Sequence, residues 1–199
     1  GFGFEWQSMW QKMLRGEHCI RPWQPEGVEE GSFPVRYAAP VDICLLPDYL
    51  KGHPAWQMTL EKRSQFGWVA ASQAISDSGL DRAQLRDAAI LCASGAPAHK
   101  LKDMLLTAAS EPSDAPAWRN LMARVDQVDA AHSLCQSNDR LARVIADDIG
   151  CEGPVVNISS ACAGASQAIG NAFQMIRRGE VDIAIAGGAD SVLSLDTMT

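Results

Sequence analysis

The fold is decided by the stretch Val155-Val156-Asn157-Ile158-Ser159-Ser160-Ala161-Cys162-Ala163-Gly164-Ala165. Its pattern predicts a β-strand that stops at Cys162 and a helix that begins at or just after it. The first N–H groups of a helix lack intrahelical partners, and the positive end of the helix dipole lies there. Both effects favour a nucleophilic thiolate. Small neighbours admit a thioester substrate, so the pattern suits acyl transfer onto sulfur. A buried structural cysteine at a tight strand–helix junction explains the same local pattern.

The residues after Cys162 predict a complete crossover unit. Apolar residues at helical spacing indicate a helix over Gln167–Arg178, and Gly179 follows as its C-cap. The apolar run Asp182–Ala186 then predicts a buried strand, which Gly187-Gly188 ends. A strand, a helix and a second strand in this order form a βαβ unit with parallel strands.

Upstream, the sequence predicts further helices and strands. Apolar periodicity predicts helices over Phe4–Arg15, Thr59–Gly79, His99–Ala109 and Asn138–Ile149. Ala88–Ala93 is a short buried strand, and Arg21–Pro54 is irregular with a short strand near Phe33–Ala38. The first helix carries Trp6, Met9, Trp10 and Met13 on one face, which predicts contact with the core or with a partner.

Four blocks around Cys162 carry a specific resemblance: SACAG (160–164), AIGNA (168–172), IRRGEVD (176–182) and AGGAD (186–190). They resemble the β-ketoacyl synthase family, and most closely its elongating type I/II enzymes, which act on acyl carrier protein (ACP). Earlier segments agree in order: Trp6–Trp10 with Leu14–Glu17 and Ile20, Phe33–Ala39 (FPVRYAA), Arg63–Phe66 and Asp77–Leu80. The resemblance covers nearly the whole chain.

The resemblance implies a fold and a reaction. The expected fold is α/β and thiolase-like, with αβαβα layers. Residues 1–199 would be its N-terminal half, with a mixed sheet and a buried nucleophile helix. Cys162 would accept an acyl group from acyl-ACP. Decarboxylative Claisen condensation with malonyl-ACP would then give a 3-oxoacyl-ACP, in fatty acid or polyketide-type synthesis. The backbone N–H of Cys162 would form part of an oxyanion hole, and no metal or redox cofactor is implied.

The resemblance also implies that this sequence is part of a larger unit. The family begins with an apolar strand, and its C-terminal half carries two catalytic histidines and a lysine; neither part has a counterpart here. We therefore expect residues 1–199 to be the N-terminal ketosynthase half. The family is dimeric, so a homodimer or a heterodimer with a related synthase subunit is expected, with the strand Pro154–Ser159 at the two-fold interface.

The resemblance also implies a residue of the acyl pocket and a basic surface for docking of ACP. Ala96 lies where the family has a glycine-rich turn near the acyl pocket, so it would help to set pocket depth, although Pro97 departs from the family glycine. ACP is acidic, so docking calls for a local basic patch. The candidates are Lys51, Lys62, Arg63, Lys100, Lys102, Arg177 and Arg178, although for any single one of them a solvated surface charge is the favoured interpretation.

Composition excludes several classes of protein. The formal charge of −7 argues against a broad nucleic-acid surface. The six cysteines are scattered without CxxC or zinc-finger spacing, which indicates no metal site and suits a reducing, cytoplasmic location. No apolar run approaches the length of a membrane span.

Two alternatives remain open from the sequence. An initiating ketosynthase that primes from acyl-CoA uses a similar motif, although the Trp6–Trp10 helix and the Phe33–Ala38 segment favour the elongating branch. A non-catalytic partner subunit of a ketosynthase heterodimer typically lacks the cysteine, so Cys162 counts against that interpretation.

Overall fold

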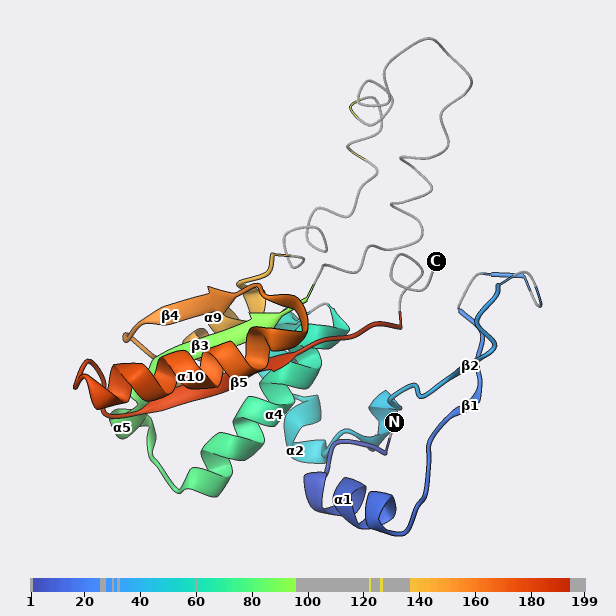
Figure 1. Cartoon of the computed structure of the whole chain (residues 1–199), viewed down its shortest axis with the longest axis horizontal. Coiled ribbons are helices and arrows are strands. Elements are labelled where there is room, and N and C mark those ends of the chain that lie inside the picture. Colours follow the sequence, from blue (N-terminus) through green and yellow to red (C-terminus); the bar gives the residue numbers. More distant parts are fainter. Residues whose placement is uncertain are drawn as a thin grey trace.

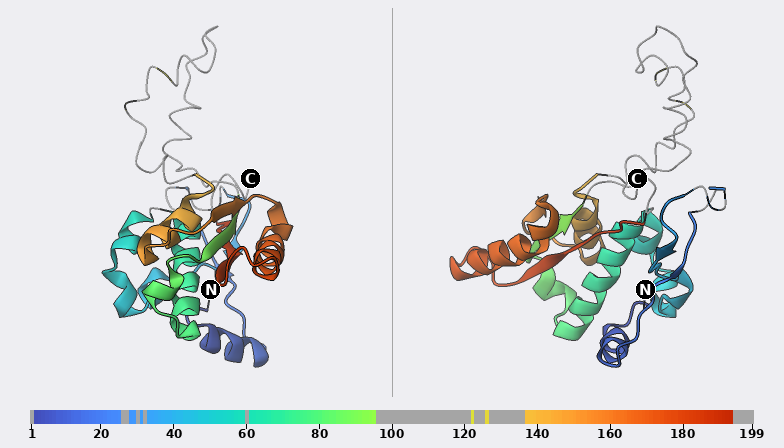
Figure 2. Two further views of the ribbon diagram at one scale, coloured as in Figure 1. Left: turned by 90° about the vertical axis from the view of Figure 1, so that its left-hand side faces the viewer. Right: turned by 45° about the vertical axis from the view of Figure 1, so that its right-hand side comes forward.

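The computed structural model of the chain describes residues 2–25, 28–29, 31, 33–59, 61–95, 122, 126 and 137–193. Three parallel strands at its centre, in the order β4-β3-β5, are covered by helices on both faces (Figures 1 and 2). The principal elements are α1 (Trp6–Leu14), β1 (Arg21–Pro22), β2 (Tyr37–Ala38), η1 (Ile43–Leu45), α2 (Asp48–Lys51), α3 (Pro54–Met58), α4 (Lys62–Ser78), α5 (Arg82–Leu85), β3 (Ala89–Ser94), α9 (Arg140–Ile149), β4 (Val155–Ile158), η3 (Ala161–Ala163), α10 (Gly164–Arg177) and β5 (Ala184–Ala189).

Strand β3 is the middle of the sheet and is buried along its whole length. It pairs in parallel with β4, with Cys92 opposite Asn157, and with β5, with Cys92 opposite Gly187. The expected mixed sheet is not seen in the described residues, because these three strands are all parallel and the antiparallel pair β1–β2 is separate from them. All three carboxyl ends therefore lie at one edge, where ligands of open α/β sheets commonly bind.

The two faces of β3 pack against different helices. One core contains Trp68 and Val69 of α4 and Leu141, Val144 and Ile145 of α9. The other contains Ala168 and Ala172 of α10, packed against Ala89 and Leu91. Because successive residues of a strand point to opposite faces, Ile90 and Cys92 join the first core. Figure 2 shows α10 on one side of the sheet and α4 with α9 on the other.

Local chemistry accounts for the ends of the helices. Glu61 caps α4 by accepting hydrogen bonds from the backbone N–H groups of Arg63 and Ser64. Gly79 after α4 and Gly150 after α9 have φ of 68° and 69°, the left-handed conformation that glycine adopts without steric cost. The helices predicted over 59–79 and 138–149 are thus confirmed with slightly shorter bounds, whereas 99–109 lies outside the described residues.

Helix α10 is buried on one face only. Gly164, Ala168 and Ala172 are buried against the sheet, while Ile169 and Phe173 are more than half exposed. The prediction of a buried nucleophile helix therefore holds here for the sheet-facing side alone. The apolar face of α1 is exposed as well, and α1 has no buried residue. In the part of the chain that the structure describes, no helix is long and apolar enough to span a bilayer.

Candidate active site

Cys162 lies on a sharp turn between strand β4 and helix α10. The strand ends at Ile158, the 3-10 turn η3 covers Ala161–Ala163, and α10 begins at Gly164. Ala161, immediately before the cysteine, has φ of 40° and is the one non-glycine residue with positive φ in the described ranges. A non-glycine residue in this region costs about 1–2 kcal/mol, and strain of this kind gathers at functional sites. The strained turn presents Cys162 as an exposed free thiol at the start of a 14-residue helix.

No serine side chain caps the turn η3 or helix α10. Ser160 occupies the N-cap position of η3 and Ala163 that of α10, and neither makes a side-chain capping hydrogen bond. The Ser160 carbonyl instead accepts from the N–H of Ala163 at 3.0 Å. The Gly164 N–H likewise donates to the Ala161 carbonyl, so backbone carbonyls of the turn take the place of a side-chain cap at the start of α10.

A cavity of about 450 Å³ opens beside the thiol. It lies at the carboxyl ends of β3 and β5 and is completed by the strained turn. The described part of its lining is made almost wholly of small residues, with Asp190 as the one charged member: Ala93, Ser94, Gly95, Ala161, Cys162, Ala165, Gly188, Ala189 and Asp190. The space suits a substrate that reaches the sulfur along an apolar wall.

Close packing explains why these residues are small. A Cβ at Gly164 would stand 2.8 Å from the Ala93 Cβ, and one at Gly188 would stand 3.1 Å from the Ala165 Cβ. Both distances are shorter than ordinary carbon–carbon contacts. The start of α10 therefore rests directly on β3 and β5, which fixes Cys162 over the ends of the strands.

The other described cysteines occupy different environments. Cys92 is buried in the core between the sheet and helices α4 and α9, and burial raises the pKa of its thiol to about 11. Cys151 donates to the Ala88 carbonyl at 3.1 Å, while Cys44 is exposed on η1. Among the described cysteines, Cys162 alone combines exposure with a helix start and a cavity.

Several sequence-predicted site residues are corrected or lie elsewhere. Arg63 was a candidate for a basic docking surface, but its side chain is 2% exposed and pairs with Glu61, so that assignment is wrong. Lys51 pairs with Asp48 and Arg178 with Glu180, whereas Lys62 is exposed. Ala96, Lys100 and Lys102 lie outside the described residues, and the proposed role of Ala96 stays a prediction.

The structure adds Asp190 to the site, which the sequence did not single out, and it places Ser94 and Gly95, the start of the turn expected near the acyl pocket, in the cavity lining. Gly95 faces Asp190, since a Cβ on Gly95 would overlap the Asp190 carboxylate. The signal for Asp190 was its place directly after the glycine-rich strand β5, at the same edge as Cys162. Ser94 and Gly95 follow from the parallel register, because Ser94 pairs with Ala189.

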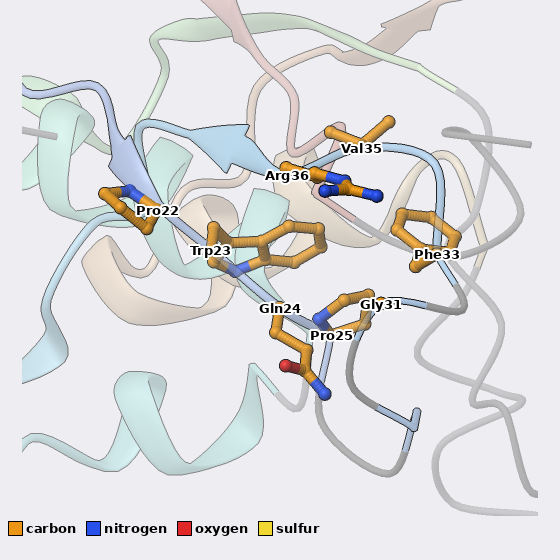
Figure 3. Close-up of a pocket in the computed structure, with 8 residues that line it drawn as sticks. All are labelled: Pro22, Trp23, Gln24, Pro25, Gly31, Phe33, Val35 and Arg36. Carbon is orange, nitrogen blue, oxygen red and sulfur yellow. The ribbon is translucent and has the colours of Figure 1, made fainter.

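A second cavity, of about 370 Å³, lies in the segment around β1 and β2 (Figure 3). Trp23 and Phe33 meet there edge to face, with ring centroids 6.2 Å apart, and Arg36 lies on the same wall. Its described lining residues carry no thiol, carboxylate or imidazole: Pro22, Trp23, Gln24, Pro25, Gly31, Phe33, Val35 and Arg36. Among the described residues, the cavity beside Cys162 is therefore the better candidate active site of these two.

Comparison with known proteins assigns the chain to a family. Residues 3–199 match the family model of the β-ketoacyl synthase N-terminal domain. A candidate polyketide β-ketoacyl synthase 1 from Streptomyces cyaneus is 30% identical over 200 residues, which cover 96% of this chain and 44% of that protein. The chain thus spans less than half the length of this relative.

Solved structures share the fold. The ishigamide ketosynthase/chain length factor superposes with a TM-score of 0.67 and 20% identity, over 96% of this chain and 45% of that one. A type II polyketide synthase acyl-carrier protein in complex with its ketosynthase, bound to the hexaketide, gives a TM-score of 0.64 and 21% sequence identity. This match covers 97% of the present chain and 43% of that one. The fold is therefore thiolase-like, and the chain belongs to the β-ketoacyl synthase family.

Proposed function

We propose that this chain is the N-terminal half of a 3-oxoacyl-ACP synthase and that Cys162 carries the growing acyl group. The observation that supports this most is the placement of Cys162 on a strained turn, at the start of α10 and at the mouth of a cavity lined by small residues. Family membership and the polyketide-type relative support a condensing enzyme of the polyketide kind.

In the first step the Cys162 sulfur attacks the carbonyl carbon of an acyl-ACP thioester. The tetrahedral intermediate carries a negative oxygen, which the backbone N–H of Cys162 would help to stabilise, as the family resemblance implies. Collapse of the intermediate breaks the bond to the carrier sulfur, and the carrier thiolate takes up the proton that the Cys162 thiol released. The acyl group is then held as a thioester on Cys162.

In the second step malonyl-ACP loses carbon dioxide, and the resulting carbanion attacks the acyl carbonyl. The bond between that carbon and Cys162 breaks, which restores the thiolate and releases a 3-oxoacyl-ACP. Of the two histidines within the described residues, His18 is exposed and His53 caps α3, so neither lines the Cys162 cavity; His99 and His132 lie outside those residues. As the family resemblance implies, we assign the promotion of decarboxylation to histidines of a C-terminal half.

The proposed partners are ACP, loaded with acyl and malonyl groups, and a second synthase subunit. Two structures that share the fold contain such components: one is a ketosynthase/chain length factor, and the other is an acyl-carrier protein in complex with its ketosynthase. Strand β4 is an edge strand with Val155 and Val156 exposed, which suits pairing across a homodimer or heterodimer two-fold. The alternative of a non-catalytic partner subunit is disfavoured by the presented Cys162.

The test is a condensation assay with the full-length protein, acyl-ACP and malonyl-ACP. We expect the wild type to form 3-oxoacyl-ACP, and Cys162→Ala to lose this activity while unfolding within about 1 kcal/mol of the wild type. Cys44→Ala is the matched control, because it removes another exposed thiol outside the cavity. Undiminished condensation by Cys162→Ala would show that another group carries the acyl chain.

A further inference from the structure

A buried ion pair lies behind the wall of the Cys162 cavity. Glu61 and Arg63 have side chains that are 4% and 2% exposed, and the Arg63 Nε donates to Glu61 Oε1 at 3.1 Å. Glu61 also accepts from the N–H of Ser64 at 2.9 Å. Desolvating two charges costs so much that a buried pair is weak evidence for stability, so another reason for its presence is needed.

The far end of Arg63 reaches the cavity wall. Its Nη1 donates to the carbonyl of Gly95, and the same atom donates to Asn138 Oδ1 at 3.3 Å. Gly95 lines the Cys162 cavity. The planar guanidinium can bridge the Glu61 carboxylate and a backbone carbonyl at once, which a single ammonium group does less well.

Asn138 extends this contact to the strands. Its carbonyl accepts from the Ser94 hydroxyl at 3.0 Å, across 44 residues of sequence. The side-chain amide of Asn157 in β4 satisfies its surroundings when its nitrogen is turned toward the Asn138 carbonyl. That nitrogen then donates to the Asn138 carbonyl at 2.7 Å and to the Cys92 carbonyl at 3.3 Å. Arg63, Asn138 and Asn157 thus join the start of α4 to the carboxyl ends of β3 and β4, directly beneath Ser94 and Gly95.

Resting on the proposed function, we infer that Arg63 is a positioning residue for acyl transfer, which holds the Ser94–Gly95 wall in place for the acyl chain bound to Cys162. On its cavity side Gly95 contacts the Asp190 carboxylate, so a shift of Gly95 alters the mouth of the cavity. Arg63 does not touch the reacting atoms. It acts through the wall, and its effect grows with the length of acyl chain that lies against that wall.

The test compares two acyl lengths in the full-length protein. The rate of Cys162 acylation is followed by intact-protein mass spectrometry with acetyl-ACP and with octanoyl-ACP. For Arg63→Lys we expect about a tenfold loss with octanoyl-ACP and less than threefold with acetyl-ACP. Alkylation of Cys162 by iodoacetamide should stay within twofold of the wild type, because this small reagent does not rely on the wall.

Two further variants keep the test decisive. Asn138→Ala removes one acceptor of Arg63 but leaves the charges of Glu61 and Arg63 paired, and we expect the same length-dependent loss on a smaller scale. Arg86→Lys is the control, since Arg86 forms an exposed pair with Glu152 away from the cavity lining and should affect neither acyl length.

The outcomes separate this inference from the proposed function. A wild type that accepts no acyl group on Cys162 overturns the proposed function and the role of Arg63 with it. If the wild type is acylated but Arg63→Lys and Asn138→Ala slow acylation by both acyl lengths equally, or by neither, the positioning role is overturned. The proposed function then still stands. An equal loss is what a purely structural role for Arg63 would produce, through a smaller folded fraction.

Discussion

Ala161 and Cys162 lie on the turn between β4 and α10, where we propose the nucleophile. The positive φ of Ala161 turns the chain out of β4, and the next residue stands at the start of α10. The pattern of an apolar strand followed by small residues allowed Cys162 to be predicted from the sequence. The strain at Ala161 could not be predicted, because alanine rarely adopts positive φ and no local signal marks it.

The reactivity of Cys162 can be compared with that of Cys44, which is also exposed but lies on the short turn η1. The dipole at the start of a long helix stabilises negative charge by up to about 1 kcal/mol at an exposed site, equivalent to roughly fivefold in rate. We expect limiting iodoacetamide to label Cys162 about fivefold faster than Cys44. Peptide mapping of the full-length protein measures this. Faster labelling of Cys44, Cys92 or Cys135 would contradict the placement argument.

Cys92 gives a prediction about alkaline stability. Burial raises the pKa of its thiol from 9.0 to about 11, so between these values the unfolded chain loses this proton while the folded chain keeps it. The stability linked to this group is complete below pH 9 and is lost as the pH rises toward 11, by roughly 3 kcal/mol at most. The urea midpoint should therefore fall more between pH 8 and pH 10.5 in the wild type than in Cys92→Ala. Parallel declines in the two proteins would show that Cys92 does not ionise differently on unfolding.

At the scale of elements, helix α10 carries two glycines in different surroundings, and only the first of them lies at the contact with the sheet. A Cβ at Gly164 would meet Ala93 at 2.8 Å, whereas one at Gly170, in the same helix, would meet nothing within 4 Å. We expect Gly164→Ala to destabilise the protein by about 1–3 kcal/mol, because the helix must move off β3, and to slow acyl transfer at Cys162.

Gly170→Ala is the matched control for this effect. Alanine has the higher helix propensity and restricts the unfolded chain, so this change should stabilise the protein by about 0.5–1 kcal/mol and leave acyl transfer unchanged. Thermal unfolding and acylation rates of the two variants measure the difference. Equal stability of the two variants would mean that the start of α10 does not rest on Ala93.

The elements themselves followed well from the sequence. Helix and strand periodicity located α4, α9, α10 and the three parallel strands to within a few residues, because each helix buries one face against the sheet and β3 is buried on both faces. The boundaries were less predictable: β5 begins at Ala184 and runs through Gly187 and Gly188, which had been expected to end it. Pairing with β3 overrides the weak strand propensity of these glycines.

The interior of the site was the part that sequence reasoning could not reach. Arg63 was interpreted as a surface charge, since isolated arginines usually are solvated. Its burial depends on Glu61, Gly95 and Asn138, which come together only in three dimensions. Ala96 remains a prediction drawn from resemblance.

At the scale of the whole molecule, large apolar side chains are exposed on α10 and on the edge strand β4. Ile169, Phe173, Ile176, Val155 and Val156 are all exposed large apolar residues. Extended apolar patches on soluble proteins mark surfaces that bind other protein. We expect a fragment of residues 1–199, expressed alone, to self-associate in size-exclusion chromatography, and Ile169→Lys with Phe173→Lys to reduce that association.

The same pair of substitutions should have the opposite effect in the full-length protein. If the proposed C-terminal half covers this face, two buried lysines there would lower the thermal midpoint or prevent assembly. Two observations would contradict this account of the covered face. One is a monodisperse, sharply melting monomer of residues 1–199, and the other is a full-length double variant as stable as the wild type.

The central claim is that Cys162 is the residue that carries the acyl group, and its most direct test is the mass of the acyl-enzyme. The full-length protein is incubated with acyl-ACP in the absence of malonyl-ACP, and its intact mass and proteolytic peptides are then measured. The account predicts one added acyl group per chain, located on the peptide that contains Cys162 and absent from Cys162→Ala. An acyl adduct that persists in Cys162→Ala, or a wild type that gains none, would contradict it.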